Sequence, residues 1–128
     1  MNEMVDRLFA YSRETYSVEP DYPFSTDPDI PVLRHLDTRK WFALFMEISR
    51  SRLGLEGSDR VWVLNIKCDP LLSGSLRMQK GYYPGYHMNH DSWLTILLDG
   101  TVPFGEITPL LDMSFELTDK KRKIKRKK

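Results

Sequence analysis

The sequence contains only one cysteine, Cys68, among its 128 residues. A single cysteine cannot form an internal disulfide, which fits a protein of the reducing cytoplasm. No run approaches the roughly 20 apolar residues that a membrane-spanning helix needs. The first residues, MNEMVDRLFAY, carry acids early and lack the long apolar stretch of a secretory signal. We therefore expect a cytoplasmic protein with no membrane partner.

The chain also lacks the motifs of common catalytic and metal sites. It has no glycine-rich phosphate loop and no paired-carboxylate site. A nucleophilic Cys68 would need a base such as His87, but a cysteine at a strand end behaves as a small apolar residue. His87, His90 and Asp91 form an H-x-x-H-D run, yet no second cluster completes a zinc site. We expect no enzyme activity, no metal and no cofactor.

The net charge of +1 conceals an uneven distribution. Eight of the nineteen Lys and Arg residues lie in 120–128, which leaves eleven basic against seventeen acidic residues in 1–118, a net charge of −6. With 41% hydrophobic and 29% charged residues, the composition suits one globular domain. We expect a monomeric, folded domain over 1–118 and a basic, disordered tail over 119–128.

Hydrophobic periodicity predicts an α+β protein in which helices pack against a mostly antiparallel sheet, in the order α-β-β-β-α-β-α. Both faces of 40–48 are largely apolar, which indicates a central strand. The segment 19–31 holds four prolines, so we expect an extended crossing anchored to the core by Tyr22 and Phe24. The predicted elements are a helix over 2–16, strands over 32–36, 40–48, 61–67 and 93–98, and two later helices.

Capping residues place the two later helices. Asp69 followed by Pro70 is a strong helix start, and this helix should continue to about Lys80, with Gly81 as its stop. Thr108 followed by Pro109 predicts the regular start of the last helix, with a possible extra turn before it. The middle helix should bury the side chains Leu71, Leu72, Leu76 and Gln79 and carry Arg77 and Lys80 in its last turns.

The stretch Pro84–Trp93, PGYHMNHDSW, is the centre of the functional hypothesis. It places Tyr, Trp, two His, an amide and a carboxylate within ten residues, between a Pro-Gly turn signal and the run of a buried strand. Loops held by a rigid scaffold often carry function. The same aromatic residues are equally suited to core packing and the histidines to capping turns, so both interpretations stay open.

Several short motifs occur along the chain in a specific order and spacing. They are Tyr22-Pro23-Phe24, Lys40-Trp41-Phe42-Ala43, Lys67-Cys68-Asp69-Pro70, Pro84-Gly85-Tyr86-His87-Met88-Asn89, Trp93, Leu98-Asp99-Gly100, Val102-Pro103 and Ser114-Phe115. Together they resemble the pattern of the MmcQ/YjbR family of small bacterial proteins. The resemblance implies a frataxin-like, double-wing α+β fold and DNA binding. In this chain the family pattern departs at His90, where Lys is common, and at Phe115, where Tyr is common, and the basic tail is an addition.

Nucleic-acid binding is accordingly the leading functional hypothesis. Aromatic rings of the loop can stack on bases, Asn89 can bond a base edge, and basic side chains can meet phosphates. The alternative is a protein-binding module, in which exposed aromatic residues around 82–93 receive a partner. The candidate DNA contacts are Lys67, Arg77, Lys80, Tyr86, His87, Asn89 and His90, with Lys120, Lys121, Arg122, Lys123, Lys125 and Arg126 of the tail.

Overall fold

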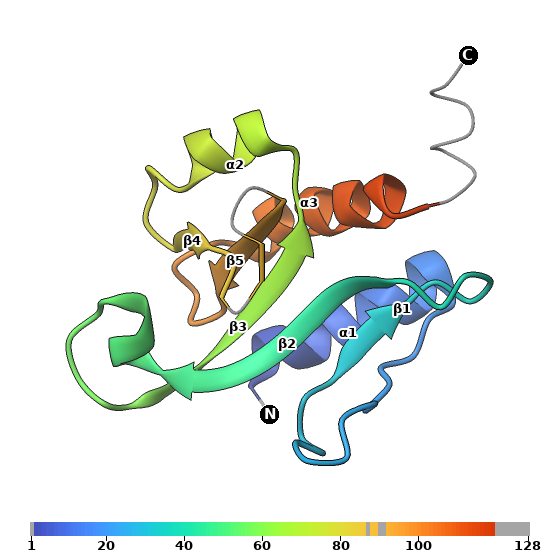
Figure 1. Cartoon of the computed structure of the whole chain (residues 1–128), viewed down its shortest axis with the longest axis horizontal. Helices are drawn as coiled ribbons and strands as arrows, with labels where there is room; N and C mark the ends of the chain where they lie inside the picture. Colours follow the sequence, from blue (N-terminus) through green and yellow to red (C-terminus); the bar gives the residue numbers. More distant parts are fainter. Residues whose placement is uncertain (1, 87, 90–91, 120–128) are drawn as a thin grey trace.

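The computed structural model describes residues 2–86, 88–89 and 92–119 (Figure 1). The predicted α+β class is confirmed, and the order is α-β-β-β-α-β-β-α, with a short 3-10 turn after the second strand. In chain order the elements are α1 (Glu3–Tyr16), β1 (Val32–Arg34), β2 (Trp41–Ser49), η1 (Arg50–Leu53), β3 (Arg60–Lys67), α2 (Pro70–Leu76), β4 (Tyr82–Pro84), β5 (Trp93–Leu97) and α3 (Phe104–Leu117).

The five strands form one sheet in the order β1-β2-β3-β5-β4, and each neighbouring pair is antiparallel. β2 and β3 are the long central strands, as the apolar faces of 40–48 predicted. The register sets Ala43 opposite Ile66 and Lys67 opposite Trp93. The edge strands β1 and β4 have three residues each, and β1 has a register shift between Leu33 and Arg34.

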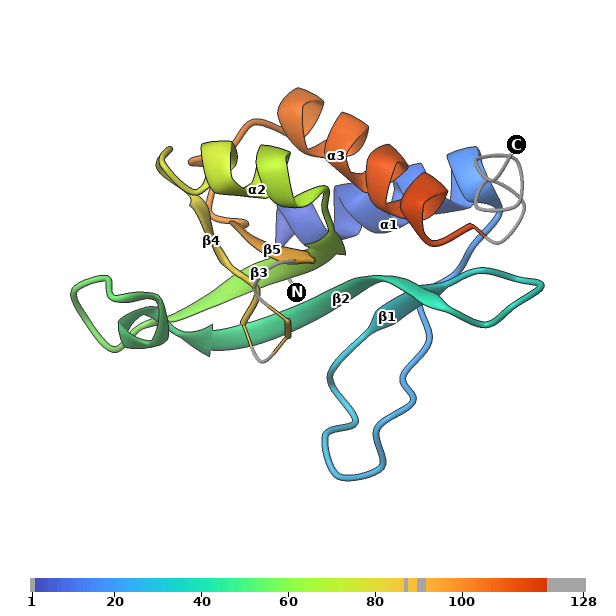
Figure 2. The ribbon, with the colours of Figure 1, turned by 45° about the horizontal axis from the view of Figure 1, so that its top comes forward.

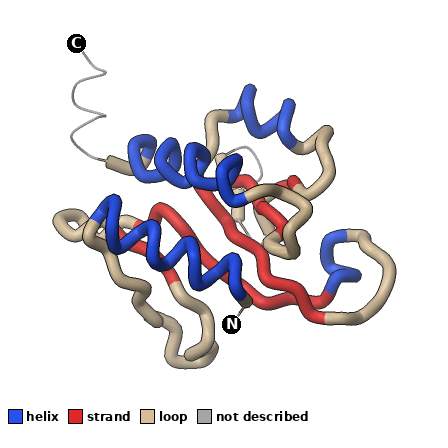
Figure 3. The backbone as a smooth tube through the Cα atoms, turned by 180° about the vertical axis from the view of Figure 1, so that it is seen from behind, coloured by secondary structure: helices blue, strands red, loops and turns tan. Residues whose placement is uncertain are grey.

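The helices α1 and α3 cover one face of the sheet, as the view from behind shows (Figure 3). Their apolar stripes meet the inward side chains of the central strands, and the ring of Phe9 packs edge-on against Phe45 with 5.0 Å between centroids. Burial of this kind is the main favourable term in folding. Fully buried members of this core include Leu8, Leu33, Phe42, Leu64, Ile66, Leu94, Ile96, Ile107 and Leu111.

The other face of the sheet carries a smaller apolar cluster, formed by Ile48, Val63 and Leu97. Tyr83 and Tyr86 pack against it, so the start of the loop after β4 lies on this face. Figure 2 shows the helices on one side of the sheet and the proline-rich segment between α1 and β1 on the other. That segment touches the sheet through an isolated bridge between Asp21 and Val32.

Helix α2 differs from its prediction in length and in orientation. It ends at Leu76, not near Lys80, because it contains glycine and two serines, which are weak helix formers. Ser73 is fully buried and Leu76 packs against the core, whereas Leu71 is 88% exposed. The predicted buried face was therefore wrong at Leu71, Leu72 and Gln79, which are all exposed. Arg77 is the C-cap of α2 and Lys80 follows it, so neither lies in the last turns of the helix as predicted.

Three further predictions need correction. The loop predicted after Gly81 begins with a strand, β4. This strand has only three residues and ends in a proline, so its sequence shows no alternation of apolar and polar side chains. Helix α3 begins at Phe104, so Pro109 lies inside it; the lost bond to the Gly105 carbonyl is tolerated because both residues are exposed to water. Tyr22 is 44% exposed and is no core anchor, whereas Phe24 packs on Trp41.

Candidate functional site

A cleft of about 410 Å³ opens where β2 begins, β3 ends, β5 begins and α3 ends. It collects three cations and two tryptophans from segments that are far apart in the sequence. We call it the basic cleft. Its lining residues are Arg39, Lys40, Trp41, Lys67, Trp93 and Thr118.

Lys67 and Trp93 meet because they are paired across the antiparallel strands β3 and β5. The Lys67 ammonium lies 5.6 Å from the centre of the Trp93 ring. This separation is within the range of a cation–π contact, which is worth about 0.5–1 kcal/mol where solvent reaches it. Both side chains are half-buried, so part of the Lys67 side chain and part of the Trp93 ring stay exposed at the cleft.

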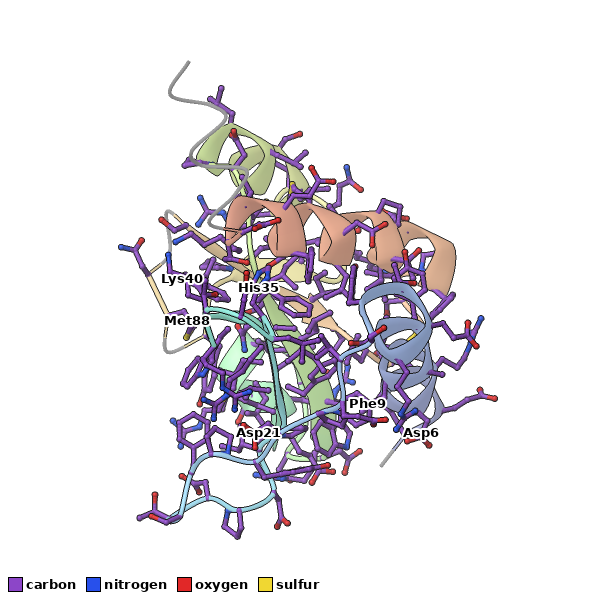
Figure 4. All side chains as sticks on the ribbon, turned by 90° about the vertical axis from the view of Figure 1, so that its right-hand side faces the viewer. Asp6, Phe9, Asp21, His35, Lys40 and Met88 are labelled. Carbon is purple, nitrogen blue, oxygen red and sulfur yellow. The ribbon has the colours of Figure 1, made fainter. Side chains whose placement is uncertain are left out.

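The turn between β1 and β2 supplies the other two cations. Arg39 adopts a left-handed backbone conformation with φ of 66°, and its N–H donates to the carbonyl of His35. The His35 N–H in turn donates to the Lys40 carbonyl at 2.9 Å, so the two ends of the turn lie together (Figure 4). Trp41 follows directly, and Phe24 packs on its ring with 5.3 Å between centroids.

Ser114 of α3 fastens the two central strands beside the cleft. Its hydroxyl donates to the Phe42 carbonyl at 2.6 Å and accepts from the Lys67 N–H at 2.8 Å. Ser114 is fully buried, so both backbone groups would be left without a partner if the hydroxyl were removed. This bridge fixes the backbone of Lys67 relative to that of β2 just after Trp41.

A buried histidine supports the rim that Thr118 forms. His35 Nε2 lies 2.7 Å from the Thr118 hydroxyl, which donates to the Ser114 carbonyl and therefore accepts from His35. The imidazole also packs on Phe115, with 4.3 Å between ring centroids. Burial lowers the pKa of His35, against the nearby charges of Asp119 and Asp37, so the ring is neutral at pH 7.

The stretch that begins at Pro84 is anchored at its first residues. The Gly85 N–H donates to the Trp93 carbonyl at 3.1 Å. A Cβ at Gly85 would lie 2.8 Å from the Trp93 Cβ, so only glycine permits this approach. The Tyr86 N–H donates to the Thr95 hydroxyl, which donates to the Asn65 side-chain oxygen at 2.5 Å. These contacts hold Trp93 in place at the edge of the cleft.

The structure separates the sequence-predicted contacts into groups. Lys67 lines the basic cleft, Asn89 is exposed in the loop, and Tyr86 is half-buried against the small apolar cluster. Arg77 and Lys80 are exposed but do not line the cleft. They precede Tyr82, which pairs with Ile96, whereas the cleft lies at the Trp93 end of β5. His87 and His90, and Lys120, Lys121, Arg122, Lys123, Lys125 and Arg126, lie outside the described residues.

Sequence reasoning missed Arg39, Lys40, Trp41 and Thr118 as site residues. A signal existed for two of them, since Lys40-Trp41 belongs to the family-like motifs and sets a cation beside an aromatic ring. Within the apolar strand predicted over 40–48, however, Trp41 looks like any other core residue. Only the strand register could show that it faces the same cleft as Trp93.

Cys68 is buried, and burial together with the adjacent Asp69 raises the pKa of its thiol to about 11. The thiol is therefore protonated at neutral pH and is not an activated nucleophile. Among the described residues, no group of three or more His, Cys, Asp and Glu side chains is arranged to hold a metal ion. The H-x-x-H-D run lies partly outside those residues. Within the same ranges, none of the helices is long and apolar enough to span a bilayer.

These features define a small α+β protein in which two helices cover one face of an antiparallel sheet and a cationic, tryptophan-lined cleft opens at the strand ends. The chain belongs to the YjbR family, whose model matches residues 13–117. The resemblance to this family seen in the sequence is thus confirmed. The matched range contains every lining residue of the basic cleft except Thr118, and it excludes the basic tail.

Three relatives show how far the likeness extends. The Bacillus subtilis (strain 168) protein YyaQ, described as uncharacterized, is 40% identical over 111 residues, which cover 87% of this chain and 94% of YyaQ. A crystal structure of a Pseudomonas syringae protein is 42% identical, with a TM-score of 0.86 over 93% of this chain and 100% of that one. The Deinococcus radiodurans protein DR2400, with a DUF419 domain, is 30% identical, with a TM-score of 0.70 over 91% and 79%. These descriptions name no ligand or reaction.

Proposed function

We propose that this YjbR-family protein is a non-catalytic DNA-binding protein, with the basic cleft as the contact surface of its folded part. The observation that carries the proposal is the convergence of Arg39, Lys40 and Lys67 with two tryptophans in one cleft, within a body whose net charge is −6. A local group of cations on an otherwise acidic body is where a phosphate backbone would be attracted.

The charges of the cleft are only partly neutralised. Arg39 lies 3.5 Å from the Asp21 carboxylate, but Arg34 lies nearer to that same carboxylate, at 2.7 Å. Exposed ion pairs of this kind are weak, so a phosphate can replace the contact of Arg39. No salt bridge to Lys40 or Lys67 is found among the described residues.

The basic tail is attached beside this cleft. Thr118 lines the cleft, and the eight Lys and Arg residues begin two positions later in the chain. Tail and cleft can therefore meet phosphates of the same strand, and we propose that the tail supplies most of the salt-sensitive, sequence-independent attraction.

The proposal is tested by measuring the affinity for a labelled 20-mer of DNA at several salt concentrations. With the full chain, affinity should fall steeply between about 50 and 200 mM salt, and a chain ending at Asp119 should show a slope smaller by several units. Lys67→Gln should weaken the binding that remains, whereas Arg77→Gln, an equal loss of charge outside the cleft, should change it little. The shortened chain should melt within a few degrees of the full chain. Absence of salt-sensitive binding at about 50 mM would sink the proposal.

One observation favours the second candidate, a protein-binding module. Leu71 and Met78, in and just after α2, are 88% and 87% exposed, and Leu72 is also exposed. Exposed apolar side chains in one short stretch can receive an apolar partner surface. Such an interface would be nearly insensitive to salt, so the same salt series distinguishes the two candidates.

A further inference from the structure

Trp41 and Trp93 line the basic cleft together with its three cations. Proteins that bind single strands combine stacking aromatic rings with a cationic groove, because every base has a flat face. A duplex keeps those faces stacked inside and must be opened before a base can enter a pocket. We propose that the basic cleft holds one unpaired base of single-stranded DNA on a tryptophan, with the flanking phosphates on its cations. This inference rests on the proposed function and adds the strand form that the cleft selects.

Both rings are held in position while part of each remains exposed. Phe24 packs on Trp41 at an interplanar angle of 82°, and Trp93 is fixed from its backbone side by Gly85. A ring that is already ordered loses little conformational freedom when a base stacks on it. The two tryptophans are thus suited to stacking on a ligand.

Lys67 takes part in both elements of the proposed contact, the stacking on a tryptophan and the binding of a phosphate. Its ammonium lies over the Trp93 ring, at 5.6 Å from the centroid. The flexible lysine stem allows the ammonium to move to a phosphate while a base takes its place on the ring. Arg39 and Lys40 lie across the same cleft, so the strand would have cations on both sides of the stacked base.

The size of the cleft also suits one nucleotide. Its volume of about 410 Å³ lies near the lower end of the range of pockets for small molecules, about 300–1,000 Å³. A base with its sugar fits such a space, whereas a duplex could touch only the rim.

The described helices argue against major-groove recognition of a duplex. Such recognition commonly inserts a helix whose exposed side chains include cations. Neither α2 nor α3 contains a single Lys or Arg, and α3 carries Glu106, Asp112 and Glu116. In α1, Arg7 lies over the Phe104 ring and Arg13 pairs with Glu19 at 2.7 Å. The accessible cations of the folded part are therefore better placed on the cleft than on a helix.

Three labelled 12-mers separate stacking from charge attraction in the full chain: oligo-dT, the same strand paired with oligo-dA, and a strand made only of abasic sites. The abasic strand matches oligo-dT in its phosphates and the duplex has twice as many, but only oligo-dT offers unpaired bases. One stacked base contributes about a factor of ten. We expect oligo-dT to bind about tenfold more tightly than the abasic strand and, in buffer of moderate salt, more tightly than the duplex.

Tryptophan variants of the full chain assign the stacking to the cleft. Trp93→Leu and Trp41→Leu should each lower the preference for oligo-dT over the abasic strand, and the corresponding Phe variants should retain most of it. Affinity for the abasic strand should not change. Trp62→Leu is the matched control, because Trp62 is the third tryptophan and lies outside the cleft.

The outcomes distinguish this inference from the proposed function. If oligo-dT, duplex and abasic strand bind equally in the unaltered chain, or if both Leu variants keep the full preference for oligo-dT, the single-strand inference is wrong although the protein binds DNA. If none of the three strands binds, the proposed function fails as well. Because the abasic comparison needs no variant, a Leu variant that does not fold leaves the test intact.

Discussion

Two clefts of similar size lie at opposite ends of the central strands and carry opposite charge. The second, which we call the acidic cleft, has a volume of about 470 Å³ against about 410 Å³ for the basic cleft. It is lined by Tyr22, Pro28, Asp29, Glu47 and Trp62. Aromatic walls are common to both, so the charge of the neighbouring side chains is what separates their chemistry.

The same two strands build both clefts. β2 contributes Trp41 to the basic cleft and Glu47 to the acidic one, while β3 contributes Lys67 and Trp62. Six residues of strand separate Trp41 from Glu47, or about 20 Å. Because this distance exceeds the screening length of about 8 Å at physiological salt, the clefts act almost independently there. A net charge near zero thus conceals one cleft lined by cations and one lined by carboxylates.

The largest expected effect comes from making both clefts acidic. In the double variant Lys40→Glu and Lys67→Glu, repulsion replaces two phosphate contacts, and affinity for oligo-dT at about 50 mM salt should fall about 100-fold. Fluorescence anisotropy measures it. The matched control is Arg77→Glu with Lys80→Glu, an equal change of charge outside the cleft, which should weaken binding far less. Equal losses in both double variants would remove the distinction between the cleft and the rest of the surface.

The next effect concerns stability at the basic cleft alone. Gly85→Ala should destabilise the fold by about 1–3 kcal/mol, because the new methyl group would collide with the Cβ and carbonyl of Trp93. Urea unfolding measures the change. Gly105→Ala is the control, since Gly105 lies in α3 with open space around it, and alanine there should stabilise by about 0.5–1 kcal/mol. An unchanged Gly85→Ala variant would mean that the loop is not fixed on Trp93.

A smaller effect should appear in the pH dependence of stability. Because burial lowers the pKa of His35 in the folded state, the unfolded chain binds a proton more readily. The His35 contribution is complete above its unfolded pKa of about 6.5 and is lost progressively as the pH falls below that value toward the lower folded-state pKa. Melting temperatures are measured at pH 7.5 and 5.5 for the unaltered chain and for His35→Gln. The difference between the two proteins gives the contribution of His35. The variant should lose less stability on acidification; an equal loss in both proteins would contradict the assignment.

The smallest expected effect lies in the acidic cleft. Glu47→Gln removes one negative charge about 20 Å along the strand from Trp41. Affinity for DNA should rise by less than about twofold at 50 mM salt and not measurably at 200 mM, where screening is stronger. Arg60→Gln, at the same end of the sheet, should shift affinity slightly in the opposite direction. An increase of tenfold for Glu47→Gln would show that the two clefts are coupled.

The fold was largely predictable because its long elements carry strong periodic patterns. The α1 helix and the four predicted strands begin and end within two residues of their predicted bounds. The short elements were harder to predict. The strand Tyr82–Pro84 has too few residues to show an alternation of apolar and polar side chains. Helix α2 has three leucines among its seven residues, and the sequence does not show which of them is buried. The Leu71 side chain faces solvent because the tertiary fold, not the local pattern, sets the orientation of so short a helix.

The candidate site was only partly predictable. Lys67 and Trp93 were singled out from the sequence, but nothing local indicates that they lie opposite each other, because 25 intervening residues separate the paired strands. Trp41 looks like any apolar residue of a central strand until the sheet register brings it to the end of β3. The local sequence pattern therefore indicated which residue types matter, but it could not show which distant segments lie next to each other.

The short edge strands limit how another protein could attach to this one. Each edge strand has only three residues. In β1, Val32 is already bridged to Asp21 and the strand is interrupted by a register shift, while β4 ends in Pro84, which has no N–H to donate. An added strand would thus find little backbone to continue the hydrogen-bond ladder. The sheet is protected at its margins from edge-to-edge aggregation, and a protein partner would have to be recruited through side chains, with the exposed leucine and methionine around α2 as the available surface.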